Sequence, residues 1–148
     1  MFATGVTVIT TLAPDGTPVG VTMNSFNSVS MEPPLVLWSF ALQARSFGIF
    51  QQAQHCAVNV LSAQQKPLAL RFSQRHDDRF EGVAWTAGTA GVPLLDGALA
   101  YLECRPTQCH PAGDHAIFVA EVLHCQHRSD GAPLLFHGGQ FYTELPLP

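Results

Sequence analysis

Two long segments in the second half of the chain alternate apolar and polar residues, and a short loop containing proline and glycine separates them. The first is GALAYLECRPTQ, beginning at Gly97, and the second is DHAIFVAEVLHCQH, beginning at Asp114. A period of two is that of a β-strand with one buried face. HPAGD, residues 110–114, has the composition of a hairpin loop. The pair therefore predicts two long antiparallel strands and a fold dominated by β-sheet.

The rest of the chain favours further strands and two short helices. Apolar and β-branched runs bounded by turn residues predict strands at residues 5–12, 19–23, 35–40, 56–61 and 133–142. Asp15-Gly16 marks a hairpin between the first two strands. The run after Pro33-Pro34 is continuously apolar, which predicts a strand buried on both faces. Helices are expected after Ser46, in the position of an N-cap, and over 64–74, with Pro67 in the first turn.

Six or more strands with two short helices predict a mainly β protein. We expect a closed or nearly closed antiparallel barrel, because closure would hide the edges of the sheet. The chain of 148 residues shows no internal repeat, low-complexity segment or linker, which favours a single domain. A domain of this size can bury a sufficient core without disulfides.

Composition excludes several classes of function. The net charge is −4, and lysine and arginine form no block, which disfavours binding to nucleic acid. No apolar run approaches the roughly 20 residues of a membrane-spanning helix. The N-terminal segment MFATGVTVITT has neither a basic region nor a small-residue cleavage site. We therefore expect a cytoplasmic protein.

Among the four cysteines, Cys109 and Cys125 lie beside histidines and raise the question of a metal site. Cys109 precedes His110, and Cys125 lies within HCQH, residues 124–127. These spacings do not match the clustered ligands of structural zinc sites. Reduced, packed cysteines with surface histidines are the interpretation we favour, and no metal is expected.

A run of small hydroxyl and amide residues, TMNSFNSVS from Thr22 to Ser30, directly precedes the apolar run. Such residues favour irregular strand ends and can leave N–H groups and hydroxyls free for a ligand. No side chain between Thr17 and Met31 ionises. A neutral, donor-rich edge beside an apolar floor suits a flat heteroaromatic ligand such as an isoalloxazine. The alternative is a polar edge strand without a ligand.

Two arginines beside predicted helix ends are candidate phosphate ligands. Arg45 directly precedes Ser46, and helix N-termini present free N–H groups that bind phosphate. Arg71 follows the apolar LAL segment and is the second candidate. Arg71, Arg75 and Arg79 fall at i, i+4 and i+8 and would share a helix face if the helix ran that far. For Arg75 and Arg79 we favour a solvated face, and a surface cation is the alternative for the two candidates.

His115 lies at the mouth of the predicted hairpin. A neutral imidazole donates or accepts a hydrogen bond and presents a flat ring, so this residue could contact a flavin or a nicotinamide carboxamide. The alternative is that Asp114 and His115 only cap a strand.

Segments spread along nearly the whole chain carry a resemblance to a known family. They are FATGVTVITT, GVTMNSFNSVSMEPPLVLWS, ARSFGIF, CAVNVLSAQQKPLALRFS, RFEGVAW, GVPLLDGALAYLEC, GDHAIFVAEV and PLLFHGGQFY. In order and spacing the chain resembles the flavin reductase-like family, short-chain NAD(P)H:flavin oxidoreductases with an FMN-binding split barrel. The implied fold is a mainly β, antiparallel split β-barrel of Greek-key type with a few short helices, in one domain over residues 1–148.

The resemblance also implies roles for individual residues. The flavin-edge residues are Thr22, Met23, Asn24 and Ser25, and those near the ribityl chain or ring are Ser28, Val29 and Ser30. The phosphate end is implied to lie at Ala44, Arg45, Ser46 and Arg71, with Phe72 also among the cofactor-binding residues. His115, as the catalytic residue, and Tyr142 are implied to border the nicotinamide.

The implied activity is hydride transfer from NADH or NADPH to FMN, with FAD possible. Members are typically homodimers with the flavin near the interface, and many pass reduced flavin by diffusion to a separate monooxygenase. Family chains usually carry an amphipathic helix before FATGV, whereas this sequence begins at Met1-Phe2; we expect this to affect stability or dimer geometry. The alternatives are a non-catalytic flavin- or haem-binding split-barrel protein and a purely structural β-barrel dimer.

Overall fold

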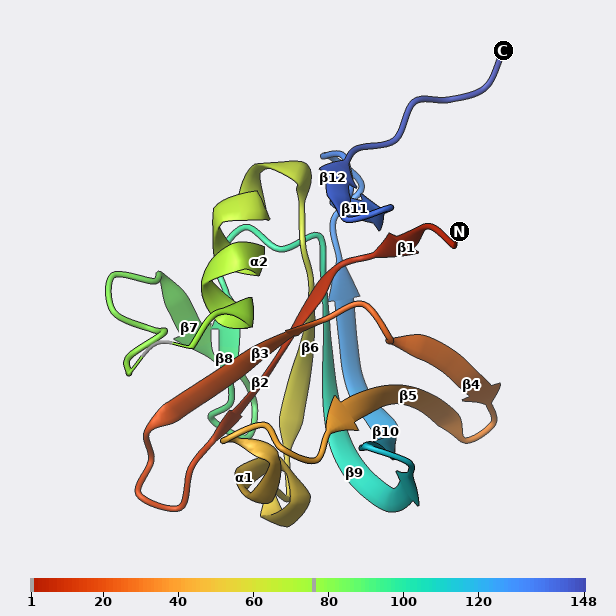
Figure 1. Ribbon diagram of the computed structural model, residues 1–148. Helices are drawn as coiled ribbons and strands as arrows, with labels where there is room; N and C mark the ends of the chain where they lie inside the picture. Colours follow the sequence, from red (N-terminus) through yellow and green to blue (C-terminus); the bar gives the residue numbers. More distant parts are fainter. Residues whose placement is uncertain (1, 76) are drawn as a thin grey trace.

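The computed structural model describes residues 2–75 and 77–148 and is built on an antiparallel sheet of seven strands (Figure 1). In spatial order the strands are β3 (Pro18–Met23), β2 (Thr7–Leu12), β6 (Cys56–Val60), β9 (Ala100–Ala112), β10 (His115–His127), β5 (Pro34–Ala41) and β4 (Asn27–Met31). The long hairpin expected from the alternating segments is confirmed, because β9 and β10 pair from His115 opposite Ala112 to His127 opposite Ala100. The hairpin expected at Asp15-Gly16 joins β2 to β3.

Two smaller sheets and two short helices complete the fold. One sheet contains β1 (Thr4–Gly5), β11 (Leu135–His137) and β12 (Gln140–Tyr142), and the other contains β7 (Trp85–Ala87) and β8 (Pro93–Leu95). The helices are α1 (Phe47–Gln52) and α2 (Lys66–Ser73), the latter preceded by the 3-10 turn η1 (Ala63–Gln65). None of the described helices has the length and apolar character needed to cross a membrane.

The large sheet is split rather than closed. Within the described residues β3 pairs only with β2, and β4 pairs only with β5, so these two strands are the edges of the sheet. Figure 1 shows β3 and the β4–β5 hairpin diverging on either side of the opening. The expected mainly β, antiparallel split barrel is therefore confirmed, and of the two forms expected from the strand count, closed or nearly closed, the closed barrel is excluded for the described residues.

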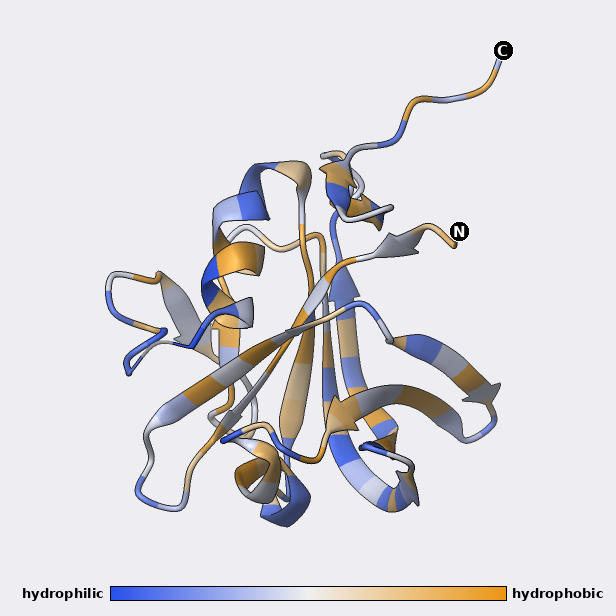
Figure 2. Ribbon diagram, viewed as in Figure 1, coloured by the Kyte–Doolittle hydropathy of each residue, from blue (hydrophilic) through white to orange (hydrophobic). Residues whose placement is uncertain are grey.

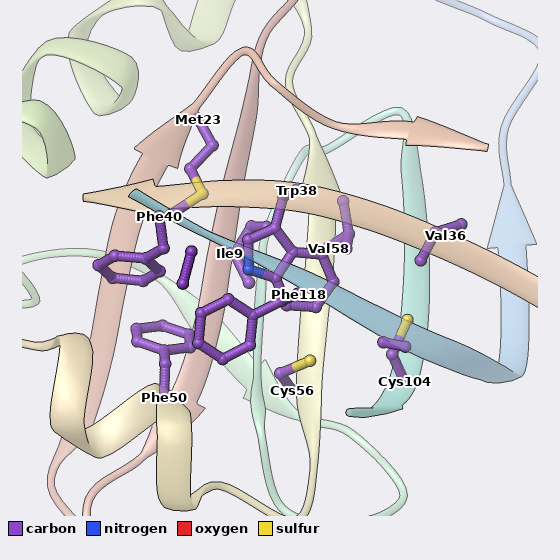
Figure 3. Close-up of a cluster of buried hydrophobic side chains, with 12 residues drawn as sticks. Ile9, Met23, Val36, Trp38, Phe40, Phe50, Cys56, Val58, Cys104 and Phe118 are labelled. Atoms are coloured by element: carbon purple, nitrogen blue, oxygen red, sulfur yellow. The ribbon is translucent and has the colours of Figure 1, made fainter. Parts of the chain in front are cut away.

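The main core lies on the inner face of β5 and β10. Val36, Trp38 and Phe40 of β5 are buried, and Phe118 of β10 stacks on Trp38 with 5.9 Å between ring centroids (Figure 3). The intervening β5 residues are only partly buried, so the prediction of a strand buried on both faces is wrong. The sequence of β5 is apolar throughout, although only one of its faces is fully buried. In β9 and β10, by contrast, polar and apolar residues alternate along the strand (Figure 2).

Helix α2 packs against β3 through a close contact at Gly20. A Cβ atom at Gly20 would lie 2.9 Å from the Phe72 ring and 3.3 Å from that of Phe80. These two rings meet edge to face at 4.9 Å. Pro67 occupies the first turn of α2, as expected, and the helix ends at Ser73. The helix is thus too short to give Arg71, Arg75 and Arg79 a common face.

Two boundaries differ in detail from the sequence prediction. The β9–β10 turn consists of Gly113 and Asp114 alone, because residues 110–112 continue β9. Gly113 has φ of +66°, which glycine adopts without strain. Ser46 occupies the N-cap position of α1 as predicted, but its side chain makes no capping hydrogen bond.

Candidate functional site

A cavity of about 260 Å³ lies in the split, between the ends of β3 and β5. Its lining residues are Val21, Thr22, Met23, Asn24, Ser25, Ser39, Phe40, Ala41, Ala44 and His115. Five of the residues expected to bind the flavin, together with the expected catalytic residue His115, therefore surround a single hollow. Met23 and Phe40 are buried apolar residues, and among the described residues of the lining only His115 has an ionisable side chain.

The free edge of β3 presents backbone groups to this cavity. The guanidinium of Arg79 donates to the carbonyl oxygen of Gly20 at 3.0 Å, so that oxygen points away from β2. The carbonyl oxygen of Met23, by contrast, accepts from Thr7 Oγ1 of β2 at 2.8 Å. Because backbone groups alternate in direction along a strand, the N–H and C=O of Thr22 share the free edge with Gly20. This edge offers one donor and one acceptor to a ligand in the split.

Two of the hydroxyls expected to face a ligand are instead used by the fold. Ser25 Oγ accepts from the Ser39 N–H at 2.9 Å and donates to the Ser39 carbonyl oxygen at 3.1 Å. Thr22 Oγ1 donates to the carbonyl oxygen of Ala69 at 2.6 Å and ties β3 to α2. The side chain left exposed beside the β3 edge is that of Asn24. Backbone groups and one amide, rather than a row of hydroxyls, thus form the polar rim.

His115 borders the cavity in a defined orientation. Its Nδ1 lies 2.7 Å from Asp114 Oδ1, and 46% of its side chain is exposed. An ionised carboxylate only accepts hydrogen bonds, so Nδ1 carries the hydrogen and Nε2 of the neutral ring remains an acceptor. The hydrogen bond from His115 holds the pKa of the Asp114 carboxyl below its ordinary value. The contact with Asp114 therefore fixes the tautomer of the neutral His115 ring at the cavity.

The two arginines expected to bind phosphate differ in their position relative to the cavity. Arg45 follows the lining residue Ala44, is 76% exposed and lies 4.0 Å from Asp77. Arg71 is in the last turn of α2, and its guanidinium donates to the carbonyl oxygens of Arg79 and Glu81, both at 2.6 Å. Arg71 is thus engaged with the backbone that follows α2.

Several other expected site residues lie outside the cavity lining of their own chain. Phe72 is fully buried under α2, and its ring packs against Phe80. Ser46 follows Arg45 without lining the hollow. Ser28, Val29 and Ser30 lie on the edge strand β4, and Tyr142 is 49% exposed on β12.

Residues 39–41 line the cavity but were not expected there from the sequence. They belong to the part of β5 beyond Leu37, which β4 does not cover, because the β4–β5 pairing runs only from Asn27 opposite Leu37 to Met31 opposite Pro34. That residues 39–41 are left uncovered by β4 depends on the register between β4 and β5, which no local sequence pattern reveals. The one sequence feature that could have indicated them is that β5 follows the polar run from Thr22 to Ser30.

A larger hollow of about 560 Å³ lies on the other side of the sheet, between the β7–β8 pair and the far ends of β9 and β10. Its lining includes Glu103, whose carboxylate accepts from the Thr89 N–H at 2.6 Å, and the described lining residues include no lysine or arginine. A negative lining without a cation does not suit a phosphorylated cofactor. The smaller cavity in the split is therefore the better candidate for a cofactor site.

The comparisons with known proteins agree with this geometry. The family model described as "Flavin reductase like domain" matches residues 1–144. The chain is 50% identical over 140 residues to the FMN reductase (NADH) SmoA of Agrobacterium fabrum, covering 95% of this chain and 79% of that protein. It is 39% identical to the flavin-dependent monooxygenase reductase subunit HsaB of Rhodococcus jostii, covering 95% of this chain and 71% of that protein.

A solved structure with bound NAD and FAD fragments shows the same fold. The NADH:FAD oxidoreductase SgcE6 of Streptomyces globisporus, in complex with NAD and FAD fragments, superposes with a TM-score of 0.92 at 39% identity. The match covers 98% of this chain and 87% of that one. From the family match over residues 1–144, the sequence identity and the split sheet, we conclude that this chain belongs to the flavin reductase-like family.

Proposed function

We propose that this protein is an NAD(P)H:flavin oxidoreductase that reduces FMN, with FAD as a second acceptor, and supplies the reduced flavin to a separate oxygenase. The observation that carries the proposal is the free edge of β3 at Thr22, which faces a cavity without carboxylates beside an oriented His115. Relatives named as an NADH-dependent FMN reductase and as a monooxygenase reductase subunit support it.

The residues of the cavity fit a flavin. An isoalloxazine ring has polar atoms along one edge and apolar faces, and the cavity pairs the backbone edge of β3 with the apolar Met23 and Phe40. Its volume of about 260 Å³ lies just below the range of roughly 300–1,000 Å³ for complete ligand sites. The cavity therefore suits the ring alone, with the phosphate arm extending out of the split.

A bound flavin supplies the hydride-accepting chemistry, and a reduced nicotinamide supplies the hydride. The protein has to hold both rings and keep water out. The Ser25–Ser39 hydrogen bonds fix the β3–β4 loop against β5 and so set the width of the split. Asp114 keeps Nε2 of His115 an acceptor, suited to the amide N–H of a nicotinamide carboxamide. The contribution of these residues is proximity and orientation, not proton transfer.

We further propose a homodimer in the cytoplasm, with the flavin near the interface. Met31 is 89% exposed and Val29 is 49% exposed on the unpaired edge of β4, which is unfavourable in an isolated monomer. A second copy against this edge would also bring the exposed Ser28 and Tyr142 and the partly buried Ser30 into use. Light scattering of the purified protein tests the dimer, and Met31→Lys should weaken it.

The activity is tested by following NADH and NADPH consumption with and without FMN, FAD or riboflavin. The proposal requires flavin-dependent consumption. Binding of flavin without consumption would identify a non-catalytic carrier instead, and no binding would leave a structural β-sheet protein. Addition of a flavin-dependent oxygenase of known substrate then tests whether the reduced flavin leaves the protein.

A further inference from the structure

The larger hollow beside β7 and β8, called here the β7–β8 hollow, has the size of a complete ligand site. Its volume of about 560 Å³ lies within the range of roughly 300–1,000 Å³ for small-molecule sites. One wall is the β7–β8 pair, and the other contains the cross-strand pairs His124–Glu103 and Gln126–Tyr101 of β10 and β9. None of its lining residues lines the cavity in the split, so the two hollows are separate.

The walls of the β7–β8 hollow are held in place by the fold itself. Glu103 accepts from the N–H of Thr89 at 2.6 Å and from the Thr89 hydroxyl at 3.4 Å. Behind the hollow, the N–H of Leu95 donates to the fully buried Asn59 Oδ1 at 2.8 Å, which fixes β8 on the large sheet. A preformed site loses little binding free energy to the ordering of its walls. A carboxylate has about four lone-pair positions, so Glu103 can still accept from a ligand.

Glu103 is also the carboxylate of this hollow whose charge is not balanced by a cation. Arg105, two residues along β9, is paired with Glu121. Arg128, which follows β10, lies 3.8 Å from Asp130. Among the described residues no lysine or arginine forms an ion pair with Glu103. The lining therefore attracts a positive charge and repels a negative one.

Tyr101 and Leu94 give the hollow an aromatic and an apolar component. The Tyr101 hydroxyl donates to the carbonyl oxygen of Leu95 at 2.6 Å, which holds the ring in place and uses the hydroxyl hydrogen. Leu94 is buried beside this ring. Aromatic rings attract ammonium groups through their negative faces, and a buried aliphatic side chain suits the alkyl groups of the same ligand.

We propose that the β7–β8 hollow binds a small organic ammonium ion. Glu103 supplies the counter-charge, Tyr101 and Leu94 contact the alkyl groups, and the exposed Gln126 and His124 provide polar groups at the rim. A metal ion is a poorer fit, because no group of three or more metal-ligating side chains comes together in the described part of the chain. The site is separate from the split, so its test does not depend on the proposed flavin-reducing function.

The first test compares choline with dimethylbutanol, a neutral molecule of the same shape in which carbon replaces the ammonium nitrogen. Binding to the full chain without added flavin is followed by NMR at pH 8, where histidines are commonly neutral. Choline should bind saturably, with a dissociation constant of about 1 mM or below, and perturb the signals of Thr89 and Gln126. Dimethylbutanol should bind at least about tenfold more weakly.

Two variants locate the recognised charge. Glu103→Gln keeps an oxygen that accepts from Thr89 but removes the charge, and it should weaken choline binding at least about tenfold. Gln126→Lys leaves Glu103 and its hydrogen bonds in place and adds a competing ammonium at the exposed rim, so it should have a similar effect. The matched control is Glu144→Gln, which removes one exposed carboxylate from the C-terminal segment and should leave choline binding unchanged.

Cys125 provides an independent readout, because it is exposed and lines the hollow. Its thiolate attacks a methanethiosulfonate to form a mixed disulfide and release methanesulfinate. A reagent that carries a trimethylammonium group is compared with one that carries a sulfonate, and each rate is divided by the rate for free mercaptoethanol. The corrected ratio should favour the cationic reagent several-fold in the wild type and fall towards one in Glu103→Gln. Peptide mass spectrometry confirms that Cys125 is the residue modified.

The outcomes are decisive for the ligand class. Equal affinities for choline and dimethylbutanol, or unchanged choline binding in Glu103→Gln, would overturn recognition of the charge. Loss of binding in Glu103→Gln together with a lowered unfolding midpoint is resolved by Gln126→Lys, since full binding in that variant would also overturn the proposal. A Cys125 that reacts with neither reagent would mean that a second protein chain covers the hollow, and would overturn the small-molecule site in favour of that contact.

Discussion

Ser25 Oγ makes both a donated and an accepted hydrogen bond with the backbone of Ser39, at 3.1 and 2.9 Å. Beyond Leu37, β5 no longer pairs with β4, and the Ser25 hydroxyl takes the place of that strand partner at Ser39. The same hydrogen bonds hold the β3–β4 loop against β5. Ser25→Ala should lower the free energy of unfolding by about 1–2 kcal/mol, because it leaves the Ser39 groups unpaired. Flavin affinity should fall as well, since the loop borders the cavity.

The matched control for that variant is Ser28→Ala. Ser28 is exposed on β4, and its side chain makes no hydrogen bond within the described part of the chain. Denaturant unfolding and flavin titration of both variants should show losses for Ser25→Ala alone. Equal stability of the two variants would mean that the Ser25–Ser39 bonds do not hold the split together.

Gly20→Ala should destabilise the protein by about 1–3 kcal/mol, because the new methyl group would lie 2.9 Å from the buried Phe72 ring. Phe72 cannot move aside easily, since it packs edge to face on Phe80. The control is Gly48→Ala in α1, where nothing lies within 4 Å of the added Cβ. That substitution should stabilise the helix by about 0.5–1 kcal/mol. Thermal unfolding of both variants should therefore give shifts of opposite sign.

Thiol reactivity should distinguish the exposed cysteine from the two buried ones. Cys56 and Cys104 are buried opposite each other on β6 and β9, whereas Cys125 is exposed. The neighbouring Cys104 thiol, together with burial, raises the pKa of Cys56. An aromatic disulfide reagent should therefore modify Cys125 rapidly and leave Cys56 and Cys104 unmodified until the protein is denatured. Rapid modification of Cys56 in the folded protein would contradict the packing of β6 against β9.

The sequence was informative where structure is local and less so where it depends on register. Alternation with a Gly-containing turn identified the β9–β10 hairpin, and the polar run from Thr22 located the rim of the cavity. The one-sided burial of β5 was missed, because a continuous apolar run does not distinguish a half-buried strand from a fully buried one. Ser39 lines the cavity because β4 does not extend that far along β5, and the length of this pairing could not be predicted from the sequence.

The arginines show the same limit at the level of single side chains. Spacing alone would put Arg71 and Arg79 on one helix face if the helix extended to residue 79, but α2 ends at Ser73. Arg71 then turns to the backbone of the following segment, and Arg79 reaches the edge of β3. These directions come from contacts between α2, β3 and the loop, so helical spacing could not predict them.

Protonation of Asp114 should uncouple it from His115 at low pH. The hydrogen bond from His115 holds the folded-state pKa of Asp114 below the ordinary value of 3.8. A carboxyl with a lowered folded pKa stabilises the fold above its ordinary pKa, and this contribution is lost as the pH falls through the lower folded value. A titration of the Asp114 carboxyl by NMR should give a midpoint below 3.8 in the wild type, moving up in His115→Ala. An unchanged midpoint in the variant would contradict the pairing.

His115→Ala should slow NAD(P)H-dependent flavin reduction about ten- to hundredfold while changing flavin affinity little. The ring borders the cavity and is 46% exposed, so it can orient the nicotinamide without supporting the flavin or the core. Asp114→Asn should show a weaker version of the same effect, because it leaves the ring in place but no longer fixes its tautomer. Single-turnover kinetics at saturating flavin, with flavin binding measured separately, distinguishes the two steps. If His115→Ala instead lowers flavin affinity and leaves the reduction rate unchanged, His115 belongs to the flavin site and the nicotinamide lies elsewhere.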